Sequence, residues 1–355
     1  MNQRLNQPDS ASIEVPHNGY HWRGRFGGQP ERFFEGWYLR VTLSEASQTF
    51  AFMYSIDDPA GNSPYSGGVA QILGPNESYY CRTFPDVHRF KASPSYLAVS
   101  HHRAKSSANN QTEGYQFTAN AHSGKLLTPS GTVQAEWNYT IKPIFTWGNP
   151  HQPKATAGWL SYLPVFEPGW QVLMAHGLAS GWIDWKGKRY EFDHSPAYAE
   201  KNWGGAFPAK WFWLQCNAFA DVPGLTITAA GGIRDVLSWK ENVGLIAIHY
   251  QGKFYEFLSI KTAFTWTIDP WGYWHLSAHD YRYRVEITGR AHDEGAYVRV
   301  PTREGMQWLC RDTTHGELRV QLWSADGQAI VDTVSHLAGL EVGGSPWDTT
   351  WAVTS

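Results

Sequence analysis

The chain has 355 residues, which is enough for two domains of ordinary size that each bury a core. Charged residues make up 17% of the chain and aromatic residues 15%, and this ring-rich composition favours sheet over helix. The formal net charge of -3 offers no basic face for the phosphates of a nucleic acid, so we expect no nucleic-acid partner.

Cysteine spacing and the start of the chain narrow the class further. Cys81, Cys216 and Cys310 form no CxxC pair, which predicts free thiols in a reducing compartment. Residues 1–15 are polar and are expected to be a disordered leader rather than a secretory signal. No window approaches eighteen apolar residues, so no membrane span is expected. No grouping of His, Asp and Glu has metal-site spacing, and we predict no metal.

Short strands separated by turn residues are expected along the first half of the chain. Ring-rich runs at 33–43 and 48–56 predict a hairpin with a short polar turn. Further strands, bounded by Gly, Pro, Asn or Ser, are expected at 68–73, 79–83, 96–101, 114–119 and 131–141. Three more are expected at 170–175, 178–185 and 188–193.

The stretch 198–215, YAEKNWGGAFPAKWFWLQ, is the centre around which the chain is organised. It places an acid, a base and an amide beside three tryptophans. Charged groups rarely lie among large apolar rings unless they are paired or used. We therefore interpret this stretch as the chemical centre and as the joint between two domains, 1–200 and 201–355.

Beyond the joint the pattern starts again. Residues 211–217, a polar turn and 225–233 repeat the layout of the first hairpin. Later strands are expected at 243–250, 253–260, 263–268, 273–278, 282–288, 298–300, 317–323, 330–334 and 347–354. Many short strands with regular turn signals predict an all-β fold of two consecutive antiparallel barrels. The interior of each barrel is expected to be filled by side chains or to hold one small apolar ligand.

Several motifs along the chain are long enough to be specific. They are PHNGYHW at 16–22, FFEGWYLRV at 33–41, FMYS at 52–55, GVAQILG at 68–74, PVFEP at 164–168, GWI at 181–183, EKNWGGAFPAKWFWLQCN at 200–217 and PWGYW at 270–274. Together they resemble the tocopherol cyclase family, which is distantly similar to carotenoid 1,2-hydratases. This resemblance implies two lipocalin-like (calycin-type) β-barrels, an N-terminal one over 1–200 and a C-terminal one over 201–355.

The resemblance also implies an activity. The family closes the chromanol ring of prenylated benzoquinols, such as methylphytylbenzoquinol and dimethylphytylbenzoquinol, in vitamin E biosynthesis without a cofactor. The start at Met1, with no plastid transit peptide, resembles the cyanobacterial form. We expect a cytoplasmic protein, peripheral on the cytoplasmic face of a thylakoid or plasma membrane, that takes its lipid substrate through an apolar rim. No protein partner is predicted.

Ring closure of this kind requires an acid. Protonating the prenyl alkene at its CH carbon makes a tertiary cation, which the quinol hydroxyl traps. The acid must be a carboxyl whose pKa is raised by apolar burial, with aromatic faces around the cation. Glu200 is the first candidate, because Tyr198-Ala199-Glu200 resembles the Tyr-x-Asp element of carotenoid hydratases. The structural alternative is an ion pair of Glu200 with Lys201 or Lys210.

Two further carboxyls are candidates for the acid. Glu35 lies between Phe34 and Trp37 in the first strand. If it is buried, it is the acid or orients the quinol, and otherwise it pairs with Arg40 or with Lys201 across the joint. Asp184 lies between Trp182 and Trp185, and an ordinary surface turn is its structural alternative.

Other side chains are expected to bind the substrate. The expected pocket walls are Trp37, Trp182, Trp203, Trp211 and Trp213, of which Trp37 has the closing of a barrel floor as its alternative. Groups expected at the quinol oxygens are Tyr54, Tyr198, Asn202 and Gln215, and the expected acceptors of the phenolic proton are His21 and His176. For the two histidines an ordinary core position is the alternative.

Two other functions remain open. One is a lipocalin-like carrier of prenylquinols or carotenoids that does no chemistry, and the other is a terpenoid hydratase or isomerase that uses the same protonation. A buried carboxyl beside the pocket separates the enzymes from the carrier, because a carrier has no use for a desolvated acid.

Overall fold

The computed structural model describes residues 15–23, 32–104, 112–149, 152–158, 161, 168–236 and 239–354. Residues 1–14 of the predicted leader and residues 164–167 of the PVFEP motif lie outside this part of the chain. Within it, the regular structure consists of strands and three short 3-10 turns, η2 (Ser44–Ala46), η3 (Pro75–Glu77) and η4 (Val87–Arg89). The predicted all-β class is confirmed.

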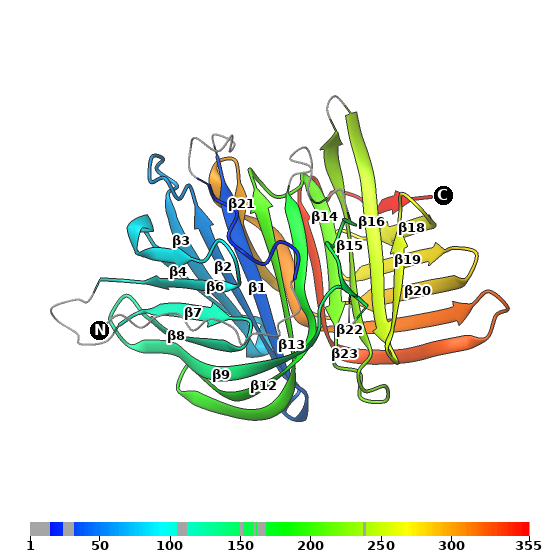
Figure 1. The fold of residues 1–355 in the computed structure, drawn as a ribbon, viewed down its shortest axis with the longest axis horizontal. Helices are drawn as coiled ribbons and strands as arrows, with labels where there is room; N and C mark the ends of the chain where they lie inside the picture. The colour runs from blue at the N-terminus through cyan, green and yellow to red at the C-terminus, as the bar shows by residue number, and fades with distance from the viewer. Residues whose placement is uncertain are drawn as a thin grey trace.

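The first large sheet is antiparallel and is built from the N-terminal part of the chain (Figure 1). Its strands lie in the order β4-β3-β2-β1-β13-β12-β9-β8-β7-β6-β5. Their bounds are β1 (Phe34–Leu43), β2 (Gln48–Asp57), β3 (Gly67–Gly74), β4 (Ser78–Phe84), β5 (Phe90–Ala92), β6 (Ala98–His102), β7 (Gly114–Thr118), β8 (Ala121–Leu127), β9 (Val133–Phe145), β12 (Gly169–Trp185) and β13 (Lys188–Gly204). A separate small ladder pairs β10 (Gly148–Asn149) with β11 (Gln152–Pro153).

The second large sheet, also antiparallel, follows in the chain and lies beside the first (Figure 1). Its order is β17-β16-β15-β14-β23-β22-β20-β19-β18-β24, and β21 pairs with β22. The bounds are β14 (Lys210–Cys216), β15 (Thr226–Val236), β16 (Trp239–Tyr250), β17 (Lys253–Leu258), β18 (Ala263–Ile268), β19 (Tyr273–His279), β20 (Tyr283–Arg290), β21 (Ala296–Thr302), β22 (Gly305–Ser324), β23 (Ala329–Gly344) and β24 (Trp351–Val353).

The two sheets share one strand order. In each sheet four consecutive strands run toward one edge, β1 to β4 in the first and β14 to β17 in the second. The first strand of each set pairs on its other side with the last long strand of its own half, β13 or β23. The repeat that the sequence predicts is therefore present in the topology.

Several strands are longer than the sequence predicts. The two strands expected at 170–175 and 178–185 form one strand, β12, whose ladder to β13 shifts register instead of stopping. β13 continues to Gly204, so most of the central stretch is strand. The short predictions were wrong because β13 has a hydrogen-bonding neighbour on each side, β1 and β12, and local pattern does not reveal such partners.

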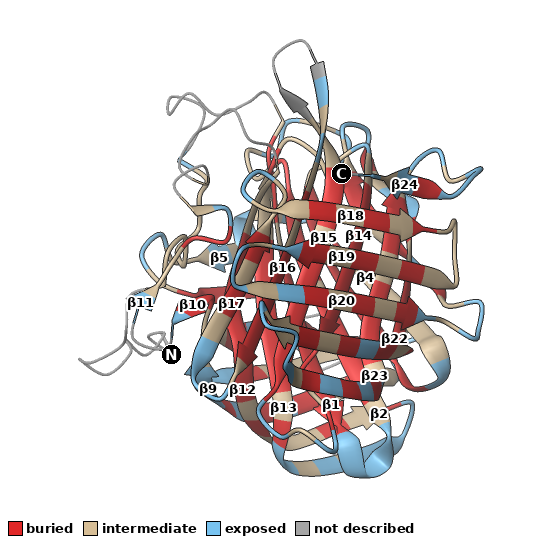
Figure 2. Ribbon diagram, turned by 90° about the vertical axis from the view of Figure 1, so that its right-hand side faces the viewer, coloured by how far each residue is buried: buried red, intermediate tan, exposed pale blue. Residues whose placement is uncertain are grey.

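Each sheet carries an apolar core on one face, and a further apolar cluster lies between the sheets. Buried residues run along the central strands of both sheets (Figure 2). Ala199 belongs to the core of the first sheet and Leu214 to that of the second. Tyr198 and Trp213, each one position away, belong to the cluster between the sheets, because successive side chains of a strand point to opposite faces. Side chains thus fill the space over the core face of each sheet.

Candidate active site

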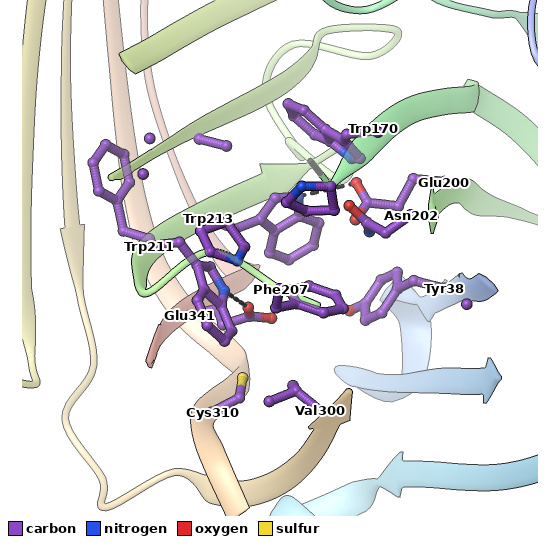
Figure 3. A pocket seen from close by; sticks show the side chains of 18 of the residues that line it. Tyr38, Trp170, Glu200, Asn202, Phe207, Trp211, Trp213, Val300, Cys310 and Glu341 are labelled. Atoms are coloured by element: carbon purple, nitrogen blue, oxygen red, sulfur yellow. Dashed lines mark hydrogen bonds between the residues drawn. The ribbon is translucent and has the colours of Figure 1, made fainter. Parts of the chain in front are cut away.

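A cavity of about 300 Å³ lies between the two sheets. The first sheet contributes Tyr38, Met53, Trp170, Glu200 and Asn202 to its walls. The second half of the chain contributes Phe207, Trp211, Trp213, Val300, Cys310 and Glu341 (Figure 3). Rings and aliphatic groups surround a few polar groups, an arrangement that suits a largely apolar ligand with one polar end.

Glu200 brings a carboxyl into this cavity from β13, and it is 7% exposed. The Tyr198 hydroxyl donates a hydrogen bond to its Oε2 at 2.6 Å, and the indole Nε1 of Trp213 donates to the same oxygen at 3.1 Å. Burial raises the pKa of Glu200 to about 7, although hydrogen bonds from Tyr198 and from two indoles oppose the rise. A large fraction of this carboxyl is therefore protonated at neutral pH.

Alternation along β13 separates Glu200 from the neighbouring lysine. Lys201 points to the other face, where its Nζ donates to Glu35 Oε1 at 2.7 Å and to the Gly19 carbonyl at 2.6 Å. The side chains of Lys201 and Glu35 are both 0% exposed. Lys201, the base of the central stretch, therefore forms a buried ion pair with Glu35 on the core face of the first sheet.

Glu35 is paired with Lys201 and does not line the cavity. The backbone amide of His21 donates to Glu35 Oε2 at 2.8 Å, and the His21 ring lies 3.3 Å from Oε1. Burial alone would raise the pKa of Glu35, but the Lys201 ammonium and His21 outweigh it and keep the pKa below its ordinary value. The Lys201 partner was one of the two that the sequence offered. Arg40 instead donates to the carbonyls of Thr314 and Leu337 at 3.1 and 2.5 Å.

Trp211 and Trp213 both reach the cavity from β14, on the face that the sequence predicts. Each indole donates to a different carboxyl, Trp213 to Glu200 and Trp211 to Glu341. Gln215 follows on the same strand and is fully buried, but it lies outside the cavity lining. Asn202 lines the cavity beside Glu200 (Figure 3).

Two candidates lie on the hairpin that joins β12 to β13. Asp184 accepts two hydrogen bonds from Arg189, both at 2.9 Å, and its side chain is 30% exposed. The Arg189 guanidinium also covers the ring of Trp182 at 4.1 Å. Neither Asp184 nor Trp182 is brought to the cavity.

The aromatic candidates of the first sheet pack mainly within its own apolar core. Trp37 and Tyr54 border the cavity, but their side chains belong to the first core, where the Tyr54 hydroxyl lies 2.7 Å from His122 Nε2. Trp203 stacks on His21, with ring centroids 4.0 Å apart.

His176 also lies outside the cavity lining, with its Nδ1 3.4 Å from Asn217 Nδ2. Burial lowers the pKa of His176 to about 4, so its ring is neutral at pH 7.

Sequence reasoning missed a second carboxyl in the cavity. Glu341 of β23 accepts the Trp211 indole N–H, and Asp312 of β22 stands directly opposite it in the β22–β23 ladder. Burial raises the pKa of Glu341, against hydrogen bonds from Trp211 and Cys310. The available signal was a single acid within the apolar run Leu340-Glu341-Val342.

Two features are absent from the described part of the chain, a group of metal-binding side chains and a membrane-spanning helix. Among the residues that the structure describes, no group of three His, Cys, Asp or Glu side chains is placed to hold a metal ion. No helix in that part of the chain is long and apolar enough to cross a membrane.

Comparisons with known proteins agree with the fold and the motifs. The family model described as "Tocopherol cyclase-like" matches residues 31–344. A "Probable tocopherol cyclase, chloroplastic" of Oryza sativa subsp. japonica is 37% identical over 390 residues, covering 98% of this chain and 82% of the rice protein. The "Tocopherol cyclase, chloroplastic" of Zea mays is also 37% identical, over 98% of this chain and 81% of its own length.

A solved structure extends the likeness to the fold. A crystal structure of a Nitrosomonas europaea protein assigned as AttH is 14% identical and superposes with a TM-score of 0.52, over 94% of this chain and 99% of that one. With a family model that spans most of its length and two plant relatives at 37% identity, the chain belongs to the tocopherol cyclase-like family.

Proposed function

We propose that this chain closes the chromanol ring of prenylated benzoquinols such as methylphytylbenzoquinol and dimethylphytylbenzoquinol. Its membership of the family and the names of the plant relatives support this activity. The observation that carries the proposal is the Glu200 carboxyl, which is buried at a ring-lined cavity and has a pKa of about 7. Such a group can deliver a proton to an alkene at neutral pH.

Glu200 is the proton donor in this proposal. Tyr198 and Trp213 donate hydrogen bonds to its Oε2, and Trp170 supplies a further hydrogen bond to the carboxyl. The proton moves to the CH carbon of the prenyl double bond, and the quinol oxygen closes on the tertiary cation. The same donors then stabilise the carboxylate that is left.

The walls of the cavity are suited to the cation. Tyr38, Trp170 and Phe207 lie around the space beside Glu200, together with Trp211 and Trp213 (Figure 3). Ring faces within about 6 Å of a positive charge stabilise it, and they are too weakly basic to remove a proton from it. Asn202 is a neutral polar group that lines the cavity beside Glu200 and can bind a quinol oxygen. The reaction is a redox-neutral isomerisation, so it needs no cofactor.

The other carboxyls predicted from the sequence have structural roles in this proposal. Glu35 neutralises Lys201 inside the first sheet, and Asp184 orders Arg189 at a hairpin. Trp203 and His21 lie around that buried pair.

The finer architecture is also part of the proposal. We regard residues 1–200 and 201–355 as two lipocalin-like, calycin-type barrels. In the first, Phe84 of β4 packs against His101 of β6 at 5.1 Å and Tyr115 of β7 at 5.6 Å, which brings opposite edges of the sheet together. This side-chain packing supports closure of the barrel.

We place the protein in the cytoplasm, in peripheral contact with a membrane that supplies its lipid substrate. Ile260 lines the cavity and is 50% exposed, as expected of an apolar rim at the entrance.

The test is turnover of the reduced methylphytylbenzoquinol in heavy water. The chromanol should carry one deuterium on the ring methylene next to the ether-bearing carbon. An unlabelled chromanol would eliminate alkene protonation. Binding without any product would favour a carrier, and an open-chain tertiary alcohol would identify a hydratase.

A further inference from the structure

Ring closure moves two protons, and Glu200 accounts for only one of them. The alkene carbon gains a proton, while the quinol oxygen loses its own as it bonds to the tertiary carbon. A protein that binds this substrate in a ring-lined cavity therefore needs a proton acceptor as well as a donor. The inference below rests on the proposed function and concerns the acceptor.

The histidines expected from the sequence do not fill this role. His21 contacts Glu35, Lys201 and Trp203 at the first sheet, and His176 lies by Asn217. Both lie outside the cavity lining. Among the described residues that line the cavity, the carboxyls are Glu200 and Glu341.

Glu341, like Glu200, lines the cavity and accepts a hydrogen bond from an indole. Its Oε1 accepts the indole N–H of Trp211, and its strand position is directly opposite Trp213 in the β14–β23 ladder. Trp213 in turn donates to Glu200 at 3.1 Å. One Trp-x-Trp strand therefore orients both carboxyls, one from each sheet, toward the same space (Figure 3).

A third carboxyl stands behind Glu341. Asp312 is its direct partner across β22 and β23, and it is 0% exposed. In the part of the chain that the structure describes, no side chain donates a hydrogen bond to Asp312, and the nearby backbone amide of Thr313 lowers its pKa without outweighing burial. Two carboxyls side by side in a buried setting do not both ionise, so the pair retains one proton and one negative charge.

Other charged and titratable groups face this pair from the surrounding elements. They are Cys310 from β22, Tyr38 and Arg40 from β1, Glu77 from η3 and Glu200 from β13. Burial raises the pKa of Asp312 well above its ordinary value, with Glu341 and Glu77 adding to the rise. The Arg40 guanidinium opposes it. The pair thus has one negative charge beside the cavity, which can accept a proton.

We propose that Glu341 accepts the proton of the quinol hydroxyl while Glu200 protonates the alkene. The O–H bond breaks and its electron pair forms the new C–O bond, and the π electrons of the alkene take the proton from Glu200. Glu200 ends as a carboxylate and Glu341 as a carboxylic acid. Water in the emptied cavity returns a proton to Glu200 and takes one from Glu341, so substrate and product remain isomers. Asp312 is a positioning residue that holds the proton of the pair, so that Glu341 carries the negative charge.

The test is Glu341→Gln in heavy water, which removes the acceptor but leaves an oxygen for the Trp211 indole. Chromanol formation should fall by about 10²–10⁴-fold, the usual contribution of a general base. The recovered quinol should gain deuterium in its prenyl chain, because Glu200 still makes the cation and the cation then loses a proton. Binding, read from quenching of tryptophan fluorescence, should be retained.

Glu256→Gln is the matched control. Glu256 also accepts an indole N–H, from Trp147 at 3.3 Å, but it lies outside the cavity lining, so turnover should be unchanged. Chromanol formation at the wild-type rate in Glu341→Gln would overturn the proposal. Loss of both product and exchange with binding intact would also overturn it. If the wild-type protein itself forms no chromanol, the result contradicts the proposed cyclase function and not the role of Glu341.

Asp312→Asn is a second variant that leaves Glu341 in place. Asp312 holds the proton of the pair, so a neutral amide in its place should leave the pKa of Glu341, and with it the acid limb of kcat/KM, close to that of the wild type. An acid limb that moves to lower pH would assign the charge of the pair to Asp312 and would contradict this role.

Discussion

Glu200 and Lys201 are neighbours in the chain, but their side chains leave β13 on opposite faces. Glu200 enters the cavity between the sheets, whereas Lys201 is buried in the first sheet against Glu35. An ammonium beside Glu200 would have held that carboxyl ionised. Their separation leaves burial as the largest influence on the pKa of Glu200, which is the condition for an acid that works near neutral pH.

Replacing Glu200 by Gln should reduce chromanol formation by about 10²–10⁴-fold, because the amide has no acidic proton. Substrate binding, followed by tryptophan fluorescence, should stay near normal. Asp184→Asn is the control, since Asp184 is a surface acid that pairs with Arg189. Full turnover by Glu200→Gln would move the acid to another group.

Glu200 should also make stability depend on pH. The carboxyl ionises near its ordinary pKa of 4.5 in the unfolded chain and near 7 in the folded one, so the folded state binds more protons between these values. Stability should therefore fall as pH rises from about 4.5 to 7, by up to about 3 kcal/mol. Thermal unfolding of Glu200→Gln should lack this fall and give a higher Tm than wild type at pH 8. Parallel pH profiles for the two proteins would contradict a raised pKa.

Tyr198→Phe removes the hydroxyl that donates to Glu200 at 2.6 Å. That hydrogen bond favours the carboxylate, so its loss should raise the pKa of Glu200 further. A hydrogen bond to a charged group contributes about 1.5–3 kcal/mol, equivalent to about one to two pH units. The alkaline limb of kcat/KM should move up by this amount. A limb that moves down or stays fixed would assign it to a group other than Glu200.

Glu35→Gln should be costly because it leaves the Lys201 ammonium buried without its partner. Breaking a buried pair from one side costs about 3–5 kcal/mol, measurable by urea unfolding. Adding Lys201→Met should recover much of the loss, since no buried charge then remains. Folded Glu35→Gln should still turn over at low temperature. Inactivity in the folded variant would show that Glu35 takes part in the reaction.

Gly343→Ala tests whether the position of the Trp211 ring, which packs against Gly343, matters for the site. A Cβ at this position would lie 2.0 Å from Cζ2 of the Trp211 ring, so the indole that binds Glu341 must shift. We expect a loss of about 1–3 kcal/mol in stability, together with lower turnover. Gly232→Ala is the control, because its Cβ meets no atom closer than 3.4 Å. Equal effects of the two substitutions would argue against a specific role for the position of the Trp211 ring.

Much of the fold follows from local sequence. Period-2 alternation and turn residues predict most of the strands, and the same alternation places Trp211 and Trp213 on one face. The strand lengths were underestimated at β12, β13, β22 and β23. Their extension depends on hydrogen-bonding partners that are distant in the chain, as in the pairing of Arg311 with Val342.

The candidate site shows the same division. The sequence alone determined the family resemblance and the all-β class, and it offered Glu200 as the candidate acid, because these depend on residue identities and on short-range spacing. Only the tertiary structure decided that Glu200 faces a cavity between sheets, that Lys201 pairs with a residue 166 positions away, and that Glu341 joins the site through Trp211. Alternation determines which residues share a face of a strand, but the other sheet that packs against that face determines what environment they meet.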